Sequence, residues 1–264
     1  LPWHPQTAAD VARRVQSVKS ILRQDPDIGW ALLLSLLPDS TTLSSGTRAP
    51  AWRSYVPSDT RDEVSREEYW AQVDEYARLA VDAARSDLER LAQLVRLISA
   101  LPSPSRPTLV AELESRAGDP PGAARLALWE EVVRLVAQHR RFRKQSWAMP
   151  AAELVELDRI AALLAPTEPV DRYRYLFNLP DDELFEDTAD YHKEAARVER
   201  MRSDAVSSIV AAKGMDGIAE LAGRCRNVSL VGTALGDLDD EAVADTVLPA
   251  WLASTESALR SCAE

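Results

Sequence analysis

The densest group of carboxylates in the sequence lies between Asp181 and Asp187, where five of the seven residues are acidic: Asp181, Asp182, Glu183, Glu186 and Asp187. Carboxylates this close together can bind a cation or act as an acid/base pair. Acidic side chains also suit the solvated first turn of a helix, where the helix dipole stabilises negative charge. We favour the helix-terminus interpretation. The chemical alternative is a small-molecule-binding or hydrolytic enzyme that uses carboxylates near Asp181–Asp187.

A second charged group, HRRFRK, runs from His139 to Lys144. Its candidate interaction residues are Arg140, Arg141 and Arg143, which have the chemistry to bind phosphate or a nucleic-acid backbone. Cations are also favourable at the C-terminal end of a helix. The formal net charge of −11 argues against a nucleic-acid partner. We therefore favour a solvated helix end, and keep a nucleic-acid-binding arm at Arg140–Lys144 as the alternative.

A third group combines arginine with tryptophan: Arg48, Trp52 and Arg53. An arginine beside a tryptophan can bind a ligand by stacking, although such a pair more often packs a loop onto the protein. These three residues are further candidate interaction residues.

Other catalytic patterns are absent from the sequence. It has no Gly-x4-Gly-Lys, no GxGxxG and no GxSxG, and the histidines His4, His139 and His192 lie far apart. Cys225 has no histidine near it in the sequence, and we interpret it as a buried small hydrophobe. We predict no catalytic residue, no cofactor and no metal site.

Composition favours a helical protein that has a sizeable core. Of the 264 residues, 46% are hydrophobic and 28% are charged, and glycine is scarce. The two cysteines form no CxxC motif, which fits a reducing cytoplasm. No apolar run approaches the ~18 residues of a membrane span. The preference for arginine over lysine suggests a GC-rich bacterial genome.

The longest amphipathic segment predicts a helix over Ala123 to Lys144. Its apolar residues recur at helical spacing and form one broad face: Leu128, Trp129, Val132, Val133, Leu135 and Val136. We expect Glu130, Glu131, Arg134 and Gln138 on the opposite, solvated side. An apolar face this wide predicts packing against several other helices.

Local signals mark the ends of other predicted helices. Ser65 with Glu68, and Ser86 with Glu89, have the spacing of capping boxes. Gly214 is expected to end a long helix that begins near Ala189. The segment Ile28 to Leu37 is apolar nearly all round, which predicts a buried helix.

No segment alternates as a strand does, so we predict an all-α fold of about ten helices without a sheet. Stacked helical hairpins in an α-solenoid-like array and a compact multi-helix bundle are both compatible with the pattern. We expect a single helical domain or array over 1–264, with two subdomains, 1–148 and 149–264, as the alternative. An ordered irregular loop is expected over 38–64.

Three stretches resemble helical regions of large bacterial multidomain proteins that carry a STAND-like NTPase or an effector domain, some of them acting in antiphage defence. The stretches are Trp3 to Thr7, Trp30 to Pro38 and Thr47 to Arg53. The resemblance implies a sensor, scaffold or oligomerisation arm, and it supplies no catalytic residue.

We therefore expect a non-catalytic helical interaction, scaffold or sensor module that belongs to a larger cytoplasmic bacterial protein. Its expected partner is another protein or other domains of the parent chain. A nucleic acid or a membrane is not expected as a partner.

Overall fold

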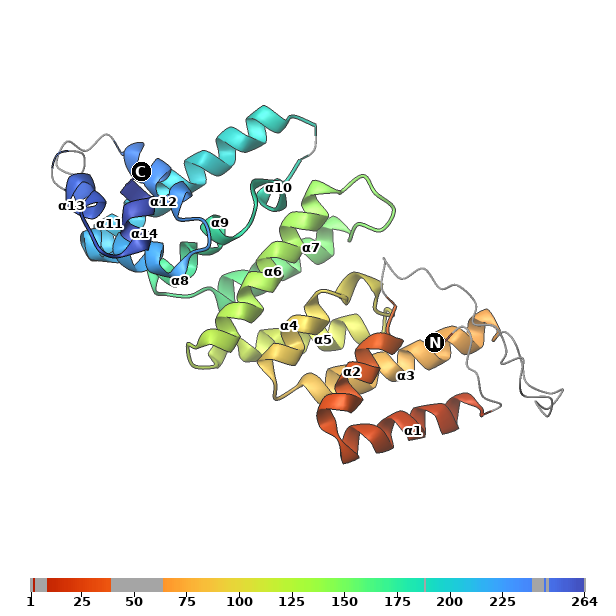
Figure 1. Ribbon diagram of the computed structural model, residues 1–264. Helices are drawn as coiled ribbons and strands as arrows, with labels where there is room; N and C mark the ends of the chain where they lie inside the picture. The colour runs from red at the N-terminus through yellow and green to blue at the C-terminus, as the bar shows by residue number, and fades with distance from the viewer. Residues whose placement is uncertain are drawn as a thin grey trace, which may run out of the picture. The chain divides into compact units, whose positions relative to one another are not determined.

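The computed structural model describes Pro2, 9–38, 64–187, 189–238, Asp245 and 247–263. Over these residues the chain is all-α, with fourteen α-helices, two short 3-10 turns and no strand (Figure 1). The predicted fold class is confirmed. Most of the predicted loop 38–64 lies outside the described residues. No described helix is long and apolar enough to cross a bilayer.

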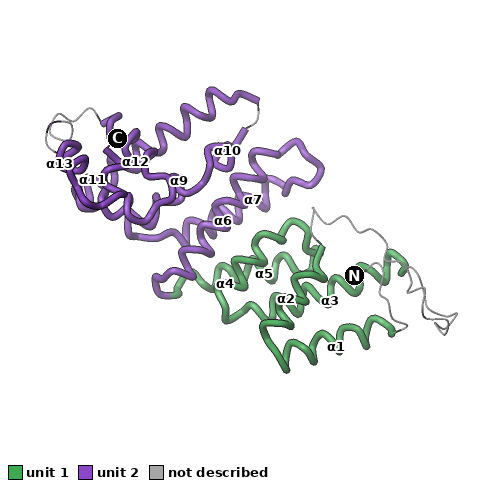
Figure 2. Tube along the Cα trace, in the orientation of Figure 1, with its two compact units in different colours: residues 1–119 green, residues 120–264 purple. Residues whose placement is uncertain are grey.

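The chain divides into two compact units, residues 1–119 and 120–264 (Figure 2). The alternative boundary at residue 148 would separate the helix that precedes it from the helix that follows it. These two helices pack directly against each other within the second unit.

In its described residues, unit 1 contains five α-helices and two 3-10 turns. They are α1 (Val11–Gln24), α2 (Pro26–Leu36), α3 (Arg66–Ala84), α4 (Leu88–Val95), η1 (Ile98–Ala100), α5 (Ser105–Ser115) and η2 (Arg116–Gly118). Helix α3 packs against α1, α2, α4 and α5, so it is the central helix of the unit. Its buried side includes Tyr69, Val73 and Tyr76, as their helical spacing predicts.

The hairpin of α1 and α2 depends on Asp25 and Gly29. The Asp25 carboxylate accepts the Ile28 N–H at 3.0 Å, so it caps α2. A Cβ on Gly29 would lie 2.4 Å from the Leu22 Cα, so only glycine allows the two backbones to approach this closely. Helix α2 is not buried all round as predicted, because Ile28 is 62% exposed.

Of the two helix caps predicted in unit 1, one is confirmed and one is wrong. The Ser65 hydroxyl accepts the Glu68 N–H at 3.1 Å and caps α3, as expected. The cap of α4 is Asp87 rather than Ser86, because the Asp87 carboxylate accepts two N–H groups of the first turn. Gly118 is the last residue of η2, and its φ is not positive.

Unit 2 contains nine α-helices in the described residues. They are α6 (Ala123–Arg141), α7 (Ala151–Leu164), α8 (Pro169–Tyr173), α9 (Tyr175–Asn178), α10 (Asp181–Leu184), α11 (Tyr191–Arg224), α12 (Val228–Gly236), α13 (Leu248–Leu252) and α14 (Ser257–Ala263). One correction concerns α6, where Glu131 is only 7% exposed although we placed it on the solvated side. Its carboxylate lies 3.2 Å from Arg134, which compensates the charge.

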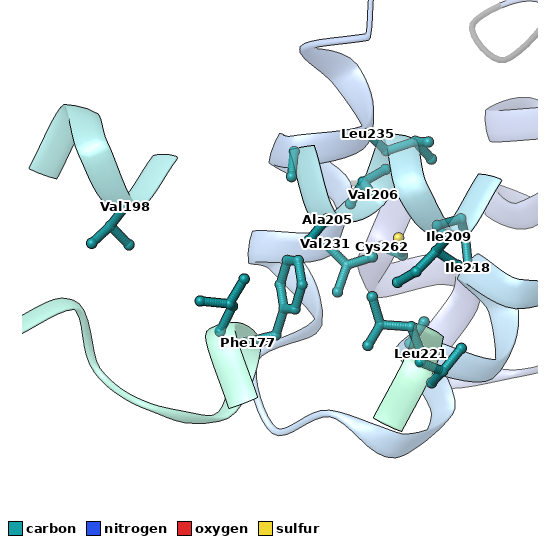
Figure 3. Close-up of a cluster of buried hydrophobic side chains, with 14 of the residues drawn as sticks. Phe177, Val198, Ala205, Val206, Ile209, Ile218, Leu221, Val231, Leu235 and Cys262 are labelled. Atoms are coloured by element: carbon teal, nitrogen blue, oxygen red, sulfur yellow. The ribbon is translucent and has the colours of Figure 1, made fainter. Parts of the chain in front are cut away.

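The core of unit 2 forms where α11, α12 and α14 meet α8, α9 and α10. Figure 3 shows Phe177, Ile209, Val231 and Leu235 among its converging side chains. Helix α11 bends around this core at Gly214, where φ is +66° and ψ is −157°. The helix end predicted at Gly214 is confirmed: this residue leaves the helical conformation, and a second helical stretch follows the kink and runs to Arg224.

Candidate functional site

The candidate residues Arg48, Trp52 and Arg53 lie outside the described residues. The other predicted candidates, Arg140, Arg141 and Arg143, lie at the C-terminal end of α6, in unit 2.

The arginines at the end of α6 are paired with carboxylates. Arg140 contacts the Asp158 carboxylate of α7, and its Nη1 lies 3.5 Å from Glu186 Oε1. The Nη1 of Arg141 contacts the Asp182 carbonyl and lies 3.2 Å from the Asp182 carboxylate. These cations therefore bind other segments of unit 2 rather than projecting alone into solvent.

The acidic segment Asp181–Asp187 supplies most of these partners. Its other carboxylates also face arginines: Asp181 with Arg202 at 2.6 Å, Glu183 with Arg134 at 3.7 Å, and Asp187 with Arg143 at 2.7 Å. The two charged groups singled out from the sequence thus lie against each other. We call this set of contacts the α10 ion pairs.

The geometry of the α10 ion pairs suits a structural role. Most of the paired side chains are more than a third exposed, and such pairs contribute about 0–1 kcal/mol each. Apolar anchoring is stronger, because Leu184 and Phe185 are about 95% buried in the core of unit 2. The ion pairs therefore orient a segment that its apolar residues already hold in place.

The chain that leads into α11 is held by a buried carboxylate, Glu194, which is 7% exposed. It accepts the Glu186 N–H at 2.8 Å and the Arg197 Nε at 3.2 Å. Burial alone would raise the pKa of Glu194, but these hydrogen bonds outweigh it and hold the pKa below its usual value.

His139 is enclosed near the end of α6 and is 2% exposed. Its Nδ1 accepts the Met149 N–H at 3.1 Å, and its ring meets Trp147 edge-on at 5.5 Å. Burial lowers the pKa of His139 because the charged form loses its hydration. The neutral imidazole therefore acts here as a packing group and hydrogen-bond acceptor.

The two thiols are poor nucleophiles. Burial raises the pKa of Cys225, and it raises the pKa of Cys262, whose charged form the neighbouring Cys225 further disfavours, to about 11. Cys262 is buried in the core of unit 2, whereas Cys225, which we expected to be buried, is only partly buried and packs against that core. Within the described ranges, no three His, Cys, Asp or Glu side chains are arranged to hold a metal ion.

A groove along one side of α3 is a surface feature of unit 1 that could accept a partner. It joins two hollows of about 810 and 560 Å³, which share Asp74 and Pro104. One wall is α3, and the other is the chain from Ser99 to the first turn of α5. We call this surface the α3 groove.

The α3 groove carries an exposed aromatic side chain, Trp70, which is 40% exposed. Sequence reasoning did not single it out. Helical periodicity gave no signal for its exposure, because Trp70 projects between the buried Ala77 and Val81 of the same helix. Tryptophan is enriched at protein–protein interfaces, so this exposed indole is a candidate contact for a partner.

No protein family, curated protein or solved structure matches this chain.

Proposed function

We propose that this chain is a non-catalytic helical interaction module that binds a protein segment in the α3 groove. The segment belongs to a partner protein or to another domain of the parent chain. The observation that carries the proposal is the exposed Trp70 in a groove between α3 and the start of α5. Interaction surfaces are enriched in tryptophan, and a concave surface excludes water from the bound segment.

The proposed module has the rigidity that such a surface requires. Helix α3 is held from its other sides by α1, α2 and α4. At the α2–α4 contact, Trp30 Nε1 donates to Gln93 Oε1 at 2.8 Å, and the Arg90 guanidinium lies 5.3 Å from the Trp30 ring centroid. A preorganised helix loses little conformational freedom when a partner binds.

The α10 ion pairs favour this proposal over its two alternatives. A catalytic carboxylate needs access to substrate, and a nucleic-acid-binding arginine needs access to phosphate. Asp182 and Asp187 instead contact Arg141 and Arg143. In the enzyme or nucleic-acid alternative, each of these side chains would exchange its present partner for a substrate or a phosphate, at a cost of about 0–1 kcal/mol per exposed pair.

The experiment compares two matched substitutions of exposed helical alanines. Ala71→Arg places a long cation in the α3 groove, and Ala211→Arg places the same side chain on α11 of unit 2. Proteins captured from the source organism by the full chain are identified and purified, and their affinities for both variants are measured by calorimetry. We expect Ala71→Arg to weaken binding by about tenfold or more, and Ala211→Arg to leave it unchanged.

Equal binding of the purified partner to both variants would overturn the groove as its binding site. Turnover of a small molecule by the purified chain would overturn the non-catalytic proposal as a whole.

A further inference from the structure

The α3 groove has a specific chemistry at the point where its two hollows meet. Trp70 and Asp74 are four residues apart on α3, so their side chains lie on the same side of the helix. Both line the smaller hollow. The Tyr69 ring meets the Trp70 ring at 5.1 Å and 78°, an edge-to-face contact that limits how the indole can turn.

Among the described residues, Asp74 differs from the other acidic side chains of the groove in having no hydrogen-bond or ion-pair partner. Glu75 pairs with Arg78, and Asp82 pairs with Arg85 at 3.0 Å. Across the part of the chain that the structure describes, no hydrogen bond or ion pair engages the Asp74 carboxylate. In its described residues, the groove therefore presents a carboxylate without a direct ion pair beside an exposed indole.

The positive charge on the opposite wall is directed elsewhere. Arg106 donates from Nε to the Leu101 carbonyl at 2.8 Å and from Nη2 to the Ser99 carbonyl at 3.1 Å. These bonds tie Arg106 to the wall that it belongs to.

We infer that the segment bound in the α3 groove delivers a cationic side chain, an arginine or a lysine, to Trp70 and Asp74. This inference rests on the proposed function and names the chemistry of its partner. The face of an indole attracts a cation, and a carboxylate accepts its N–H groups. Arginine suits the pair better than lysine, because a planar guanidinium can stack on the ring while its edge donates to Asp74.

An uncharged apolar or proline-rich segment is the competing occupant, since Pro38, Pro102 and Pro104 also line the smaller hollow. Such a segment would contact Trp70 but would gain nothing from the Asp74 charge. The two occupants therefore differ in how binding depends on that charge.

The probe is N-acetyl-arginine amide, and its uncharged control is N-acetyl-citrulline amide, which has nearly the same shape. The full chain is labelled with 15N-tryptophan, and the Trp70 indole resonance is assigned by its loss in Trp70→Phe. We expect the arginine amide to shift this resonance in a saturable manner at millimolar concentration, and the citrulline amide to bind roughly fivefold more weakly. Added salt should weaken the arginine response, because Asp74 is near the surface.

The matched variants are Asp74→Asn, which removes the charge from the groove, and Asp204→Asn, which removes one from an exposed position on α11. We expect Asp74→Asn to reduce the arginine response to the level of the citrulline control, and Asp204→Asn to leave it unchanged. Equal responses to the two amides, no Trp70 shift, or a response unaffected by Asp74→Asn would overturn the inference.

These outcomes are separable from a failure of the proposed function. If Ala71→Arg weakens the purified partner but Asp74→Asn does not, the groove binds a segment without this cation. If the arginine amide binds through Asp74 but Ala71→Arg leaves partner binding intact, the cation site stands and the proposed interaction surface is wrong.

Discussion

Arg202, on α11, bonds at once to the carboxylate of Asp181 and to the backbone carbonyl of Leu176. Its Nη2 lies 2.6 Å from the carboxylate, and its Nε donates to the carbonyl at 2.9 Å. Arg202 is 3% exposed, whereas the Asp181 side chain is 43% exposed. This buried guanidinium fastens α9 and α10 onto α11, and it connects the α10 ion pairs to the core of unit 2.

Replacing Arg202 tests that role. Arg202→Ala removes the donor of the buried Leu176 carbonyl and leaves a void where the side chain packs. We expect the free energy of unfolding to fall by about 1.5–3 kcal/mol, the range for a hydrogen bond to a charged group. Urea unfolding followed by circular dichroism measures the change. Arg200→Ala, at an exposed position on α11, is the control and should stay within about 0.5 kcal/mol. Equal losses in the two variants would show that Arg202 has no special structural role.

The kink in α11 gives a second prediction, with its control on the same helix. Gly214 has a φ of +66° and a ψ of −157°, a conformation that is essentially restricted to glycine. We expect Gly214→Ala to destabilise the chain by about 1–3 kcal/mol. Gly223→Ala should instead stabilise it by roughly 0.5–1 kcal/mol, because Gly223 is helical and a Cβ there meets no atom within 4 Å. If both variants were stabilised, α11 would not need its kink.

The α1–α2 contact gives a third prediction. An added Cβ on Gly29 would lie 2.4 Å from the Leu22 Cα and 2.8 Å from the Leu22 N, and these backbone atoms cannot rotate away. Overpacking costs about 1–3 kcal/mol, and alanine returns only about 0.5–1 kcal/mol of helix propensity. We therefore expect Gly29→Ala to lower the free energy of unfolding of unit 1 by about 1–2 kcal/mol in denaturant titrations.

The control for this prediction is Gly118→Ala in η2, where a Cβ meets nothing within 4 Å. Its effect should lie within about 0.5 kcal/mol. A Gly29→Ala variant as stable as this control would contradict the close packing of α1 on α2.

Stability should depend on pH through His139. Burial lowers the pKa of His139 in the folded state, so between that pKa and the unfolded value of about 6.5 the unfolded chain binds more protons. The stability associated with neutral His139 is complete above pH ~6.5 and is lost as the pH falls toward the folded pKa. The slope of this loss cannot exceed about 1.4 kcal/mol per pH unit for one proton.

Denaturant titrations between about pH 7.5 and pH 5.5 measure this dependence. His139→Gln keeps an oxygen acceptor for the Met149 N–H but cannot take up a proton in this range. We expect the variant to lose less stability on acidification than the native chain. Identical slopes would show that His139 does not titrate on unfolding in this window.

Local chemistry in the sequence was sufficient to predict an all-α fold. The apolar spacing of α6 and the Ser65 cap of α3 depend on residues within one or two turns of one another. Errors arose where two neighbouring side chains could make the same contact. Ser86 and Asp87 both had side chains able to cap α4, and the carboxylate of Asp87 makes the contacts. The exposed Ile28 shows that hydrophobicity alone does not bury every side of a helix.

The sequence by itself determined that apolar residues at helical spacing must be buried by packing helix on helix, and it located the charged groups of unit 2. Only the tertiary structure decided that these groups face each other, since Arg141 and Asp182 are 41 residues apart. It likewise decided that Trp70 stays exposed beside Asp74. Contacts of this kind depend on how helices that are far apart in the sequence pack together. The local periodicity of the chain does not specify that packing.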